Sequence, residues 1–191
     1  MEYLIVGLGN PGQEYELTRH NIAWDCLDKY PAVSSQIWKS KFKGLFTSFD
    51  YSGNKYYVLK PQTYMNLSGE SVQAMMKFFK IPLSNVIVLH DDIDLDFGLI
   101  IFKRGGGLAG HNGLKSINNL CGGPNFMRLR LGVGRPKYGS VSSWVLSKFS
   151  GDDLILLDRY FELVTAALEE FCNKGFDRAS NKFSRKKIEE I

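Results

Sequence analysis

Short runs of apolar residues alternate along the chain with stretches in which apolar residues recur every three or four positions. The runs at residues 3–6 and 86–89 have the length of buried strands. The spacings that start at Ile22 and Val72 fit one face of a helix instead. Strands that alternate with helices are typical of an α/β domain. With no repeat, linker or low-complexity block, the pattern predicts a single domain over residues 1–191.

A β-hairpin is predicted between the first and second helical patterns. Residues 45–51 and 55–59 are rich in β-forming side chains, and Ser52-Gly53-Asn54 between them provides a turn. Pro61 is expected to end the second strand. Because hairpin strands are antiparallel, the expected fold class is α/β with a mixed rather than a purely parallel sheet.

The longest helical pattern runs from Asp152 to Lys174, with acidic residues at its start and Gly175 after its end. Its apolar stripe is expected to pack on the sheet and consists of Leu154, Leu157, Phe161, Val164, Leu168 and Phe171. The segment that follows, about residues 176–191, is predicted to be a basic helix. Such a helix could face RNA, or it could be a solvated terminus.

The composition adds limits on size, partner and compartment. The chain has 191 residues, 44% of them hydrophobic, which suffices for one well-buried domain, and a formal net charge of +4. That charge permits a polyanionic partner without requiring one. No run of 18 apolar residues occurs and the first residues enter a strand, so neither a membrane span nor a signal peptide is expected. Three widely spaced cysteines favour a reducing compartment, the cytoplasm.

A glycine-rich turn, Gly7-Leu8-Gly9-Asn10-Pro11-Gly12, follows the first predicted strand. Its glycines match the spacing of a dinucleotide fingerprint, which needs a helix that opens inside the turn. Helical spacing resumes only at Ile22, and Asp25 and Asp28 lie inside that helical pattern rather than at a strand end. A dinucleotide-binding oxidoreductase is therefore a poor alternative. Asn10, at the crest of the turn, offers both an amide donor and a carbonyl acceptor.

His20 lies in Thr18-Arg19-His20-Asn21, directly before the first helical pattern. This position brings the imidazole near the end of the strand that carries Asn10, where it is a candidate general base. A lone histidine at a helix start is equally compatible with an ordinary structural residue, and its own position does not decide between the two.

An acidic cluster at residues 90–96 follows the buried run at 86–89. Strand ends of this kind hold the chemistry of many α/β proteins, and Asp91 is well placed to orient an imidazole. A calcium loop is excluded, because its glycine comes one position late, at Gly98, and Lys103 occupies the position of the bidentate glutamate. No zinc-binding spacing occurs near the three histidines either. The alternative is a solvated acidic turn.

A basic, glycine-rich loop runs from Phe102 into His111-Asn112, where a helix begins. It lacks the Gly-Lys-Ser/Thr of a phosphate-binding Walker loop, so it is either a flexible connector or a loop that folds over a substrate. Further on, Arg128 and Arg130 alternate with apolar residues on a predicted strand. Two such arginines suit a phosphate, or else they form the solvated face of an edge strand.

Three asparagines, Asn10, Asn66 and Asn112, each precede or begin a predicted helix, and no serine or cysteine shows a nucleophile elbow. Taken with His20 and Asp91, this set suits a reaction that uses activated water. The imidazole would take a proton from water while the carboxylate fixes its tautomer. Carboxamides would hold the substrate and stabilise an oxyanion. An ester or similarly labile acyl bond, with a phosphate-bearing leaving group, is the expected target.

Five blocks occur in order: GLGNPGQEYELTRHN, TYMNLSG, HDDIDL, GGGLAGHNGLKSI and FMRLRLGVGRP. In these blocks the chain closely resembles bacterial-type peptidyl-tRNA hydrolases, from residue 3 to at least residue 187. The resemblance implies hydrolysis of the ester between a peptide and the terminal ribose of tRNA, by a monomer without a metal or other cofactor. It also implies a three-layer α/β/α sandwich around a twisted mixed β-sheet. The implied partner is peptidyl-tRNA, with no membrane and no obligate protein partner.

The resemblance also implies the role of each matching residue. His20 would be the catalytic base and Asp91 its partner. Substrate-binding positions are Asn10, Tyr15, Tyr64, Met65, Asn66, His111 and Asn112. Lys103 and Arg130 match residues associated with the 5′ phosphate end of the tRNA.

Two alanines depart from the family pattern, Ala109 in the glycine-rich loop and Ala23 after the His20 block, where glycine is usual. Each adds one methyl group, so altered loop mobility or helix packing is expected rather than lost chemistry. The remaining alternative is an RNA-binding protein with the same fold and no activity, for which replacing His20 would change nothing.

Overall fold

A computed structural model describes residues 1–188 of the 191-residue chain. Over these residues the strands form one mixed sheet in the order β2-β3-β4-β1-β5-β7-β6-β8. The strands are β1 Glu2–Gly7, β2 Lys39–Lys41, β3 Gly44–Tyr51, β4 Asn54–Pro61, β5 Val86–Asp92, β6 Leu99–Arg104, β7 Met127–Gly132 and β8 Lys186–Lys187. The four central strands, from β4 to β7, are parallel, and the outer strands are antiparallel to their neighbours. The predicted hairpin is β3–β4, and the mixed sheet is confirmed.

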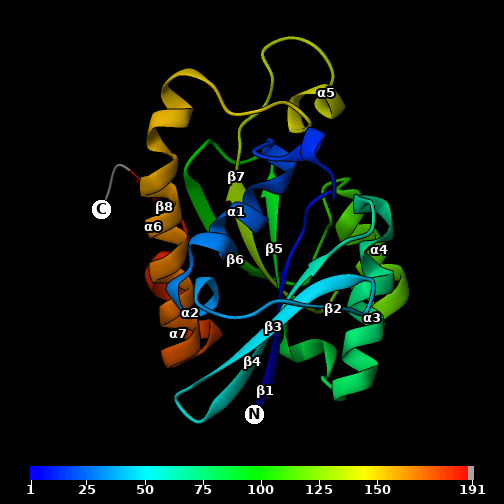
Figure 1. The fold of residues 1–191 in the computed structure, drawn as a ribbon. Helices are drawn as coiled ribbons and strands as arrows, with labels where there is room; N and C mark the ends of the chain where they lie inside the picture. Colours follow the sequence, from blue (N-terminus) through cyan, green and yellow to red (C-terminus); the bar gives the residue numbers. More distant parts are fainter. Residues whose placement is uncertain (189–191) are drawn as a thin grey trace.

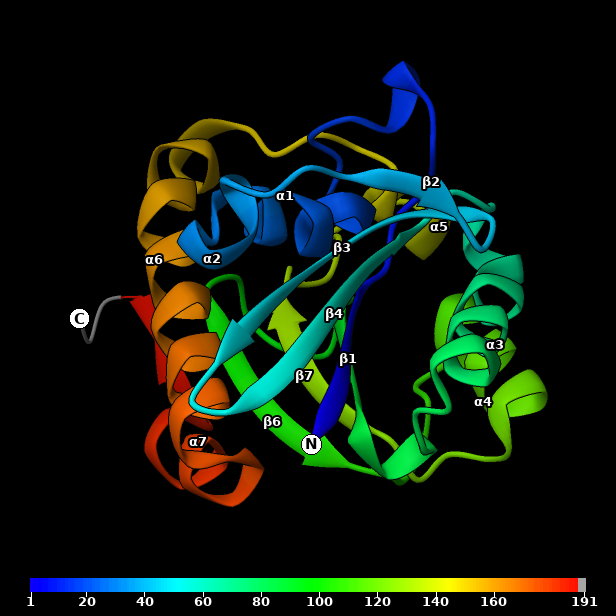
Figure 2. The same cartoon turned by 60° about the horizontal axis from the view of Figure 1, so that its bottom comes forward.

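Helices cover both faces of this sheet (Figures 1 and 2). The α-helices are α1 Ile22–Lys29, α2 Pro31–Ser34, α3 Ser68–Phe79, α4 Asn112–Cys121, α5 Val141–Val145, α6 Gly151–Lys174 and α7 Phe176–Phe183. Short 3-10 turns are η1 Gln13–Tyr15, η2 Arg19–Asn21, η3 Met65–Leu67 and η4 Leu83–Asn85. Helices α1, α2, α6 and α7 lie on one face and α3 and α4 on the other. The three-layer arrangement agrees with the predicted fold class.

Two hydrophobic clusters, one on each face of the sheet, hold the layers together. Because side chains alternate along a strand, Ile5 on β1 joins the cluster under α1 and α6, whereas Leu4 and Val6 join the cluster under α3 and α4. Every residue of β5 is buried. A strand buried on both faces reads as a continuous apolar run, and that is the pattern at residues 86–89.

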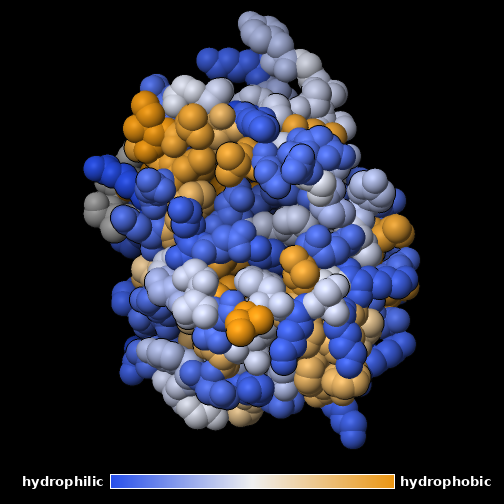
Figure 3. Space-filling model, in the orientation of Figure 1, coloured by the Kyte–Doolittle hydropathy of each residue, from blue (hydrophilic) through white to orange (hydrophobic). Residues whose placement is uncertain are grey.

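Helix α6 departs from its predicted packing in its first turns. Leu157, Phe161 and the later stripe residues are buried, but Leu154 is 53% exposed and its neighbour Ile155 is 78% exposed. Figure 3 shows hydrophobic side chains gathered over this end of α6. The prediction that Leu154 packs on the sheet is wrong, because the helix reaches the core only from its second turn.

The end of the described chain also differs from the prediction. Helix α7 stops at Phe183, and Arg185, at φ 66°, turns the chain back so that its N–H donates to the carbonyl of Ile100, 2.8 Å away. The next residues form β8 against β6, and Ile188 is buried against Gly98. A helix over about 176–191 is therefore wrong beyond Phe183, and residues 189–191 lie outside the described residues.

The parallel strands carry the chain to a common edge of the sheet. The carboxyl ends of β1, β4 and β5 lead to Asn10, to Tyr64-Met65-Asn66 and to Asp91. Carboxyl ends of parallel strands meet at the same edge, which brings these three segments together. Within residues 1–188, no helix has the length and apolar character needed to cross a membrane.

Candidate active site

A pocket of about 380 Å³ opens at this edge of the sheet. Its polar lining consists of Asn10, His20, Asn66, His90, Asp91, Asp92, His111, Asn112 and Ser142, and its remaining lining includes Tyr64, Met65, Ile93, Leu108, Ala109, Val141, Val145 and Leu146. Eight of the nine residues predicted to be catalytic or substrate-binding belong to this lining, and Tyr15 is the exception. Tyr15, Lys103 and Arg130 lie outside it.

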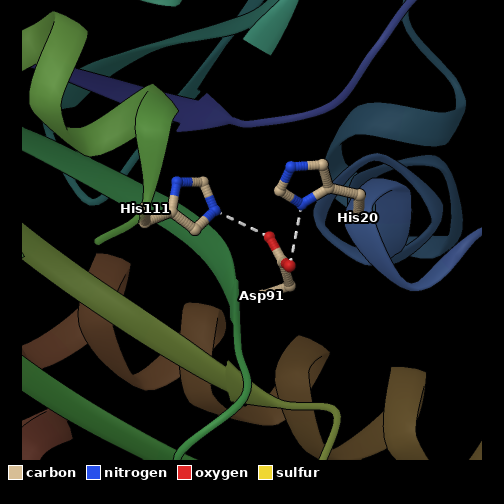
Figure 4. Close-up of side chains that lie close together, drawn as sticks. All are labelled: His20, Asp91 and His111. Atoms are coloured by element: carbon tan, nitrogen blue, oxygen red, sulfur yellow. Dashed lines mark hydrogen bonds and ion pairs between the residues drawn. The ribbon is translucent and has the colours of Figure 1, made fainter. Parts of the chain in front are cut away.

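Asp91 lies between two imidazoles (Figure 4). One carboxylate oxygen, Oδ2, is 2.8 Å from Nδ1 of His20, and the other, Oδ1, is 2.7 Å from Nε2 of His111. The carboxyl is buried, with 2% exposed, whereas His20 is 14% exposed toward the pocket. Three segments far apart in sequence, η2, β5 and the start of α4, supply these side chains.

The hydrogen bonds fix the tautomer of each imidazole. Nδ1 of His111 accepts from the backbone N–H groups of Gly113 and Leu114, because His111 is the N-cap of α4. The proton of the neutral ring is therefore on Nε2, which donates to Asp91. His20 likewise donates from Nδ1 to the ionised carboxylate, so its Nε2 carries a free lone pair. That nitrogen is the atom that can accept a proton.

Burial and charge act in opposite directions on these groups. Burial raises the pKa of the Asp91 carboxyl, but the imidazoles of His20 and His111 outweigh burial and hold this pKa well below its usual range. Burial lowers the pKa of the His20 imidazole, but the charge and hydrogen bond of Asp91 outweigh it and raise this pKa above its usual value. The carboxylate therefore stays ionised and favours a proton on the imidazole.

His90 completes the support of Asp91 from the opposite face of β5, a role that the sequence did not indicate. Its Nδ1 donates to the backbone carbonyl of Asp91 at 2.8 Å, and its ring packs edge-on against His111 with centroids 5.2 Å apart. Burial lowers the pKa of His90 well below its usual value, with a further contribution from His111, so the ring is neutral. The solvated acidic turn considered from the sequence is wrong for Asp91 and Asp92, both of which are buried.

Asn10 is held by a second asparagine. Its N–H donates to Oδ1 of Asn21 at 2.8 Å, and its carbonyl accepts from Nδ2 of Asn21 at 2.9 Å. Its own side-chain oxygen accepts from the N–H of Met65 at 2.8 Å. Since the oxygen already accepts one hydrogen bond and no bond from the side-chain NH2 group occurs within residues 1–188, this NH2 group is the main donor left for a ligand.

Asn66 and Asn112 line the same pocket and are both exposed there. Neither is a helix cap: Tyr64 precedes η3 and His111 caps α4. From the sequence alone, Asn66 could equally be an N-cap or a turn residue, and the structure places it inside the turn η3 and not at a cap. Tyr15 lies in η1, where its carbonyl accepts from the N–H and Oγ1 of Thr18, and it shapes the turn before His20 rather than the pocket wall.

The two arginines of β7 have different environments. Arg128 is buried, and its guanidinium donates to the carbonyl of Gly105. Arg130 is 18% exposed, and its Nε donates to Asp92 at 2.8 Å. Since β7 lies between β5 and β6, it is not an edge strand, and the two arginines do not form an exposed phosphate-binding pair. Lys103, exposed on β6 opposite Arg128, shares this face of the sheet with Arg130.

The alanines that depart from the family pattern have different surroundings. Ala109 adopts φ 48°, in the left-handed region, in the exposed loop that lines the pocket. A side chain there carries a steric cost that glycine lacks. Ala23 is fully buried in α1, where the helix packs closely on the end of β1 at Gly7.

Within residues 1–188, the side chains close enough together to hold a metal ion are those of His20, Asp91 and His111. Their three potential ligand atoms lie within 4.8 Å of one another. Both nitrogen–oxygen pairs have ordinary hydrogen-bond lengths, and the backbone bonds of His111 assign a proton to the nitrogen that would ligate. Hydrogen bonding accounts for this arrangement, and the absence of a metal requirement stays a prediction.

Comparison with known proteins gives a consistent match over the whole chain. The family model described as peptidyl-tRNA hydrolase matches residues 4–191. The chain is 41% identical over 186 residues to a peptidyl-tRNA hydrolase of Geobacter sulfurreducens, covering 97% of this chain and 96% of that protein. It is 45% identical over 186 residues to one from Clostridium novyi, covering 95% and 97%. A crystal structure of peptidyl-tRNA hydrolase from Acinetobacter baumannii aligns with a TM-score of 0.87 at 36% identity, covering 97% and 96%.

Proposed function

The chain belongs to the peptidyl-tRNA hydrolase family, and we propose that it hydrolyses the ester between a peptide and the terminal ribose of tRNA with His20 as the general base. One observation carries the assignment of the base. Nδ1 of His20 is held by the buried carboxylate of Asp91, while Nε2 keeps its lone pair at the wall of the pocket. Such a nitrogen is suited to deprotonate a water molecule.

In the proposed reaction, Nε2 of His20 takes a proton from water as the water oxygen bonds to the ester carbonyl carbon. The imidazolium that forms is stabilised by Asp91, which stays ionised. When the tetrahedral intermediate collapses, the carbon–oxygen bond to the ribose breaks and His20 returns the proton to the ribose oxygen. The products are the peptide, whose new carboxyl group loses its proton to solvent, and tRNA with its terminal hydroxyl, and no group other than water is consumed.

The asparagines supply donors for the substrate. The NH2 groups of Asn10, Asn66 and Asn112 are suited to bind peptide carbonyls and the oxygen that becomes negatively charged in the intermediate. His111 acts by holding Asp91, and Tyr64 and Met65 contribute apolar surface to the peptide site. Tyr15, which lies outside the pocket lining, contributes to the turn that carries His20.

Lys103 and Arg130 are proposed to contact phosphates of the tRNA, whose charge complements the mildly basic chain. Arg130 already pairs with Asp92, so it is a fixed rather than a mobile cation. We propose further that the protein acts as a monomer in the cytoplasm, where its substrate is formed.

The test is release of the N-acetyl-amino acid from N-acetyl-aminoacyl-tRNA, in the presence of EDTA, by the wild type and by His20→Ala. Wild-type turnover that survives EDTA and falls at least about 10³-fold in the variant supports the proposal. An unchanged unfolding midpoint of the variant excludes loss of folding as the cause. Activity lost to EDTA points instead to a metal held by His20, Asp91 and His111. No wild-type activity leaves an RNA-binding protein, and the mechanism is then wrong.

A further inference from the structure

Arg19 directly precedes His20 in η2, and it is a charged residue with only 3% of its side chain exposed. A guanidinium is always charged in proteins, so burying it is costly unless its donors are satisfied and its charge is compensated. The partners of Arg19 come from residues 144–153, far away in sequence.

Three hydrogen bonds join one guanidinium nitrogen to this distant segment. Nη1 of Arg19 lies 2.7 Å from Oγ of Ser147, 3.3 Å from the carbonyl of Ser147 and 2.8 Å from the carbonyl of Lys148. The backbone N–H of Arg19 also donates to the carbonyl of Ser147 at 3.1 Å, and Thr18 forms a β-bridge with Lys148. The turn that carries His20 is thus bonded to the segment by backbone and side chain together.

The flat face of the same guanidinium is covered by an aromatic ring. Its carbon Cζ lies 3.5 Å from the ring centroid of Trp144 and 5.1 Å from that of Phe149. Nη2 is 3.8 Å from a carboxylate oxygen of Asp153, and Nε has no hydrogen-bond partner within the described residues. A planar cation that stacks and donates at once is something arginine provides and lysine does not.

The segment bonded to Arg19 also forms one wall of the pocket. Val141 and Val145 of α5 and the next residue, Leu146, line the pocket. Trp144 and Ser147 contact Arg19 instead. Trp144 is held on its other side too, since its Nε1 donates to the carbonyl of Gly134 at 2.8 Å. Within residues 1–188, η2, the turn that contains Arg19, is the element that α5 contacts most extensively.

We propose that Arg19 is a positioning residue that fastens the apolar wall formed by Val141, Val145 and Leu146 to the turn carrying His20, and that this wall binds the peptide part of the substrate. The proposal rests on the proposed hydrolase function and assigns the peptide, rather than the tRNA, to this side of the pocket. Arg19 itself does not touch the substrate. Its effect is therefore on substrate affinity and not on proton transfer.

Arg19→Lys keeps the charge but loses the fork and the stacking plane. The expected result is a KM for N-acetyl-aminoacyl-tRNA that rises about tenfold, equivalent to about 1.4 kcal/mol, with kcat changed less than about threefold. The pH at which activity falls on the acidic side should not move, because His20 keeps Asp91. Arg159→Lys makes the same change at an exposed position of α6 and should leave KM as in the wild type.

Trp144 allows the contact to be tested from its other side. Trp144→Leu removes the ring under the guanidinium and should raise KM by a similar factor, whereas Trp144→Phe keeps an aromatic face and should raise it less. If the two residues act through one contact, the double variant Arg19→Lys/Trp144→Leu should raise KM by much less than the product of the two single effects. Independent, multiplicative effects would overturn the proposal.

Hydrogen–deuterium exchange of residues 135–148 gives a readout that does not depend on activity. Arg19→Lys should speed exchange in this segment and leave the β1 and β5 amides protected, and Arg159→Lys should change neither. Exchange and KM that both match the wild type would refute the role of Arg19. Faster exchange in a protein whose wild type hydrolyses nothing would uphold the fastening and reject the hydrolase function instead.

Discussion

Asn21 brackets the backbone of Asn10: its side-chain oxygen accepts the N–H of Asn10 at 2.8 Å and its side-chain nitrogen donates to the carbonyl of Asn10 at 2.9 Å. Asn21 is 97% buried, so both bonds form away from solvent. The pair ties the end of β1 to the turn that carries His20. Through this contact, the position of a substrate-binding carboxamide is fixed relative to the proposed base.

Replacing Asn21 by alanine should therefore lower activity, although Asn21 itself makes no contact with the substrate in the proposed mechanism. The buried N–H and carbonyl of Asn10 would each lose a partner, which costs about 1–3 kcal/mol of stability per group. A displacement of Asn10 by about 1 Å is expected to reduce kcat/KM by roughly 10²-fold. Steady-state kinetics and urea unfolding check this, with Asn119→Ala, at an exposed position of α4, as the control. Full activity in Asn21→Ala would show that Asn10 needs no such support.

Asp91→Asn should change both the rate and its pH dependence. In the wild type, Asp91 raises the pKa of His20 against the lowering effect of burial, so activity should fall on the acidic side with a pKa above about 6.5. Without the negative charge, burial dominates and that pKa should fall below about 6.5, which extends the active range toward lower pH. The maximal rate should drop by about 10²–10⁴-fold, because the amide can select the wrong tautomer.

A kcat/KM profile from pH 5 to pH 9 tests this prediction. His111→Gln is the matched comparison, since it removes the other partner of Asp91 but leaves the bond between Asp91 and His20. That variant should keep a pKa above about 6.5. An acidic limb that stays in place in Asp91→Asn would mean that Asp91 does not set the pKa of His20.

Ala109→Gly should leave the protein at least as stable as the wild type. An alanine at φ 48° carries a steric cost of about 1–2 kcal/mol, whereas the added freedom of glycine in the unfolded chain costs about 0.4–1 kcal/mol. The expected net change is between about zero and 1.6 kcal/mol in favour of the variant. Ala109→Val should destabilise, because a branched side chain tolerates this conformation less well. Urea unfolding of the three proteins decides, and a clearly less stable Ala109→Gly would contradict the prediction.

Lys103→Ala should weaken tRNA binding by an amount that depends on salt. If Lys103 contacts a phosphate, the slope of log affinity against log salt concentration should become shallower by about 1. Stability should not change, because Lys103 is exposed. Arg130→Gln should have the same effect on the slope, but it should also destabilise the fold by leaving buried Asp92 without its cation. Lys55→Ala, which removes a cation paired with Asp50, is the control. An unchanged slope in Lys103→Ala would remove this residue from the tRNA site.

The sequence predicted the parts of the fold that depend on local pattern. The apolar run at residues 86–89, the hairpin turn around Gly53 and the helix after Asn112 all lie where periodicity and turn chemistry indicated them. The convergence of Asn10, His20 and Asp91 followed from the rule that parallel strands end at one edge. The strand order, which places β1 between β4 and β5 and completes this grouping, was not predicted from the sequence.

The errors and omissions share a different cause, namely contacts between distant segments. Alternation along β7 gave Arg128 and Arg130 the same face, but it did not reveal that the Gly105 loop covers only Arg128. Strand β8 consists of Lys186 and Lys187, and lysine has a low strand propensity. It forms nevertheless because β6 offers an open edge with which it pairs. The roles of Asn21 and Arg19 depend on partners distant in sequence, which local sequence patterns do not identify.

The position of β1 in the middle of the sheet has a consequence for synthesis of the chain. Strand β1 leaves the ribosome well before β4 and β5, the strands with which it pairs, whose residues 54–61 and 86–92 are made later. Until then β1 is an apolar strand with two open edges, the kind of segment that recruits other chains. The pocket closes later still, when residues 141–146 have emerged. Chains released before that point are therefore expected to be inactive and prone to aggregate, so translation at least through residue 146 precedes any function.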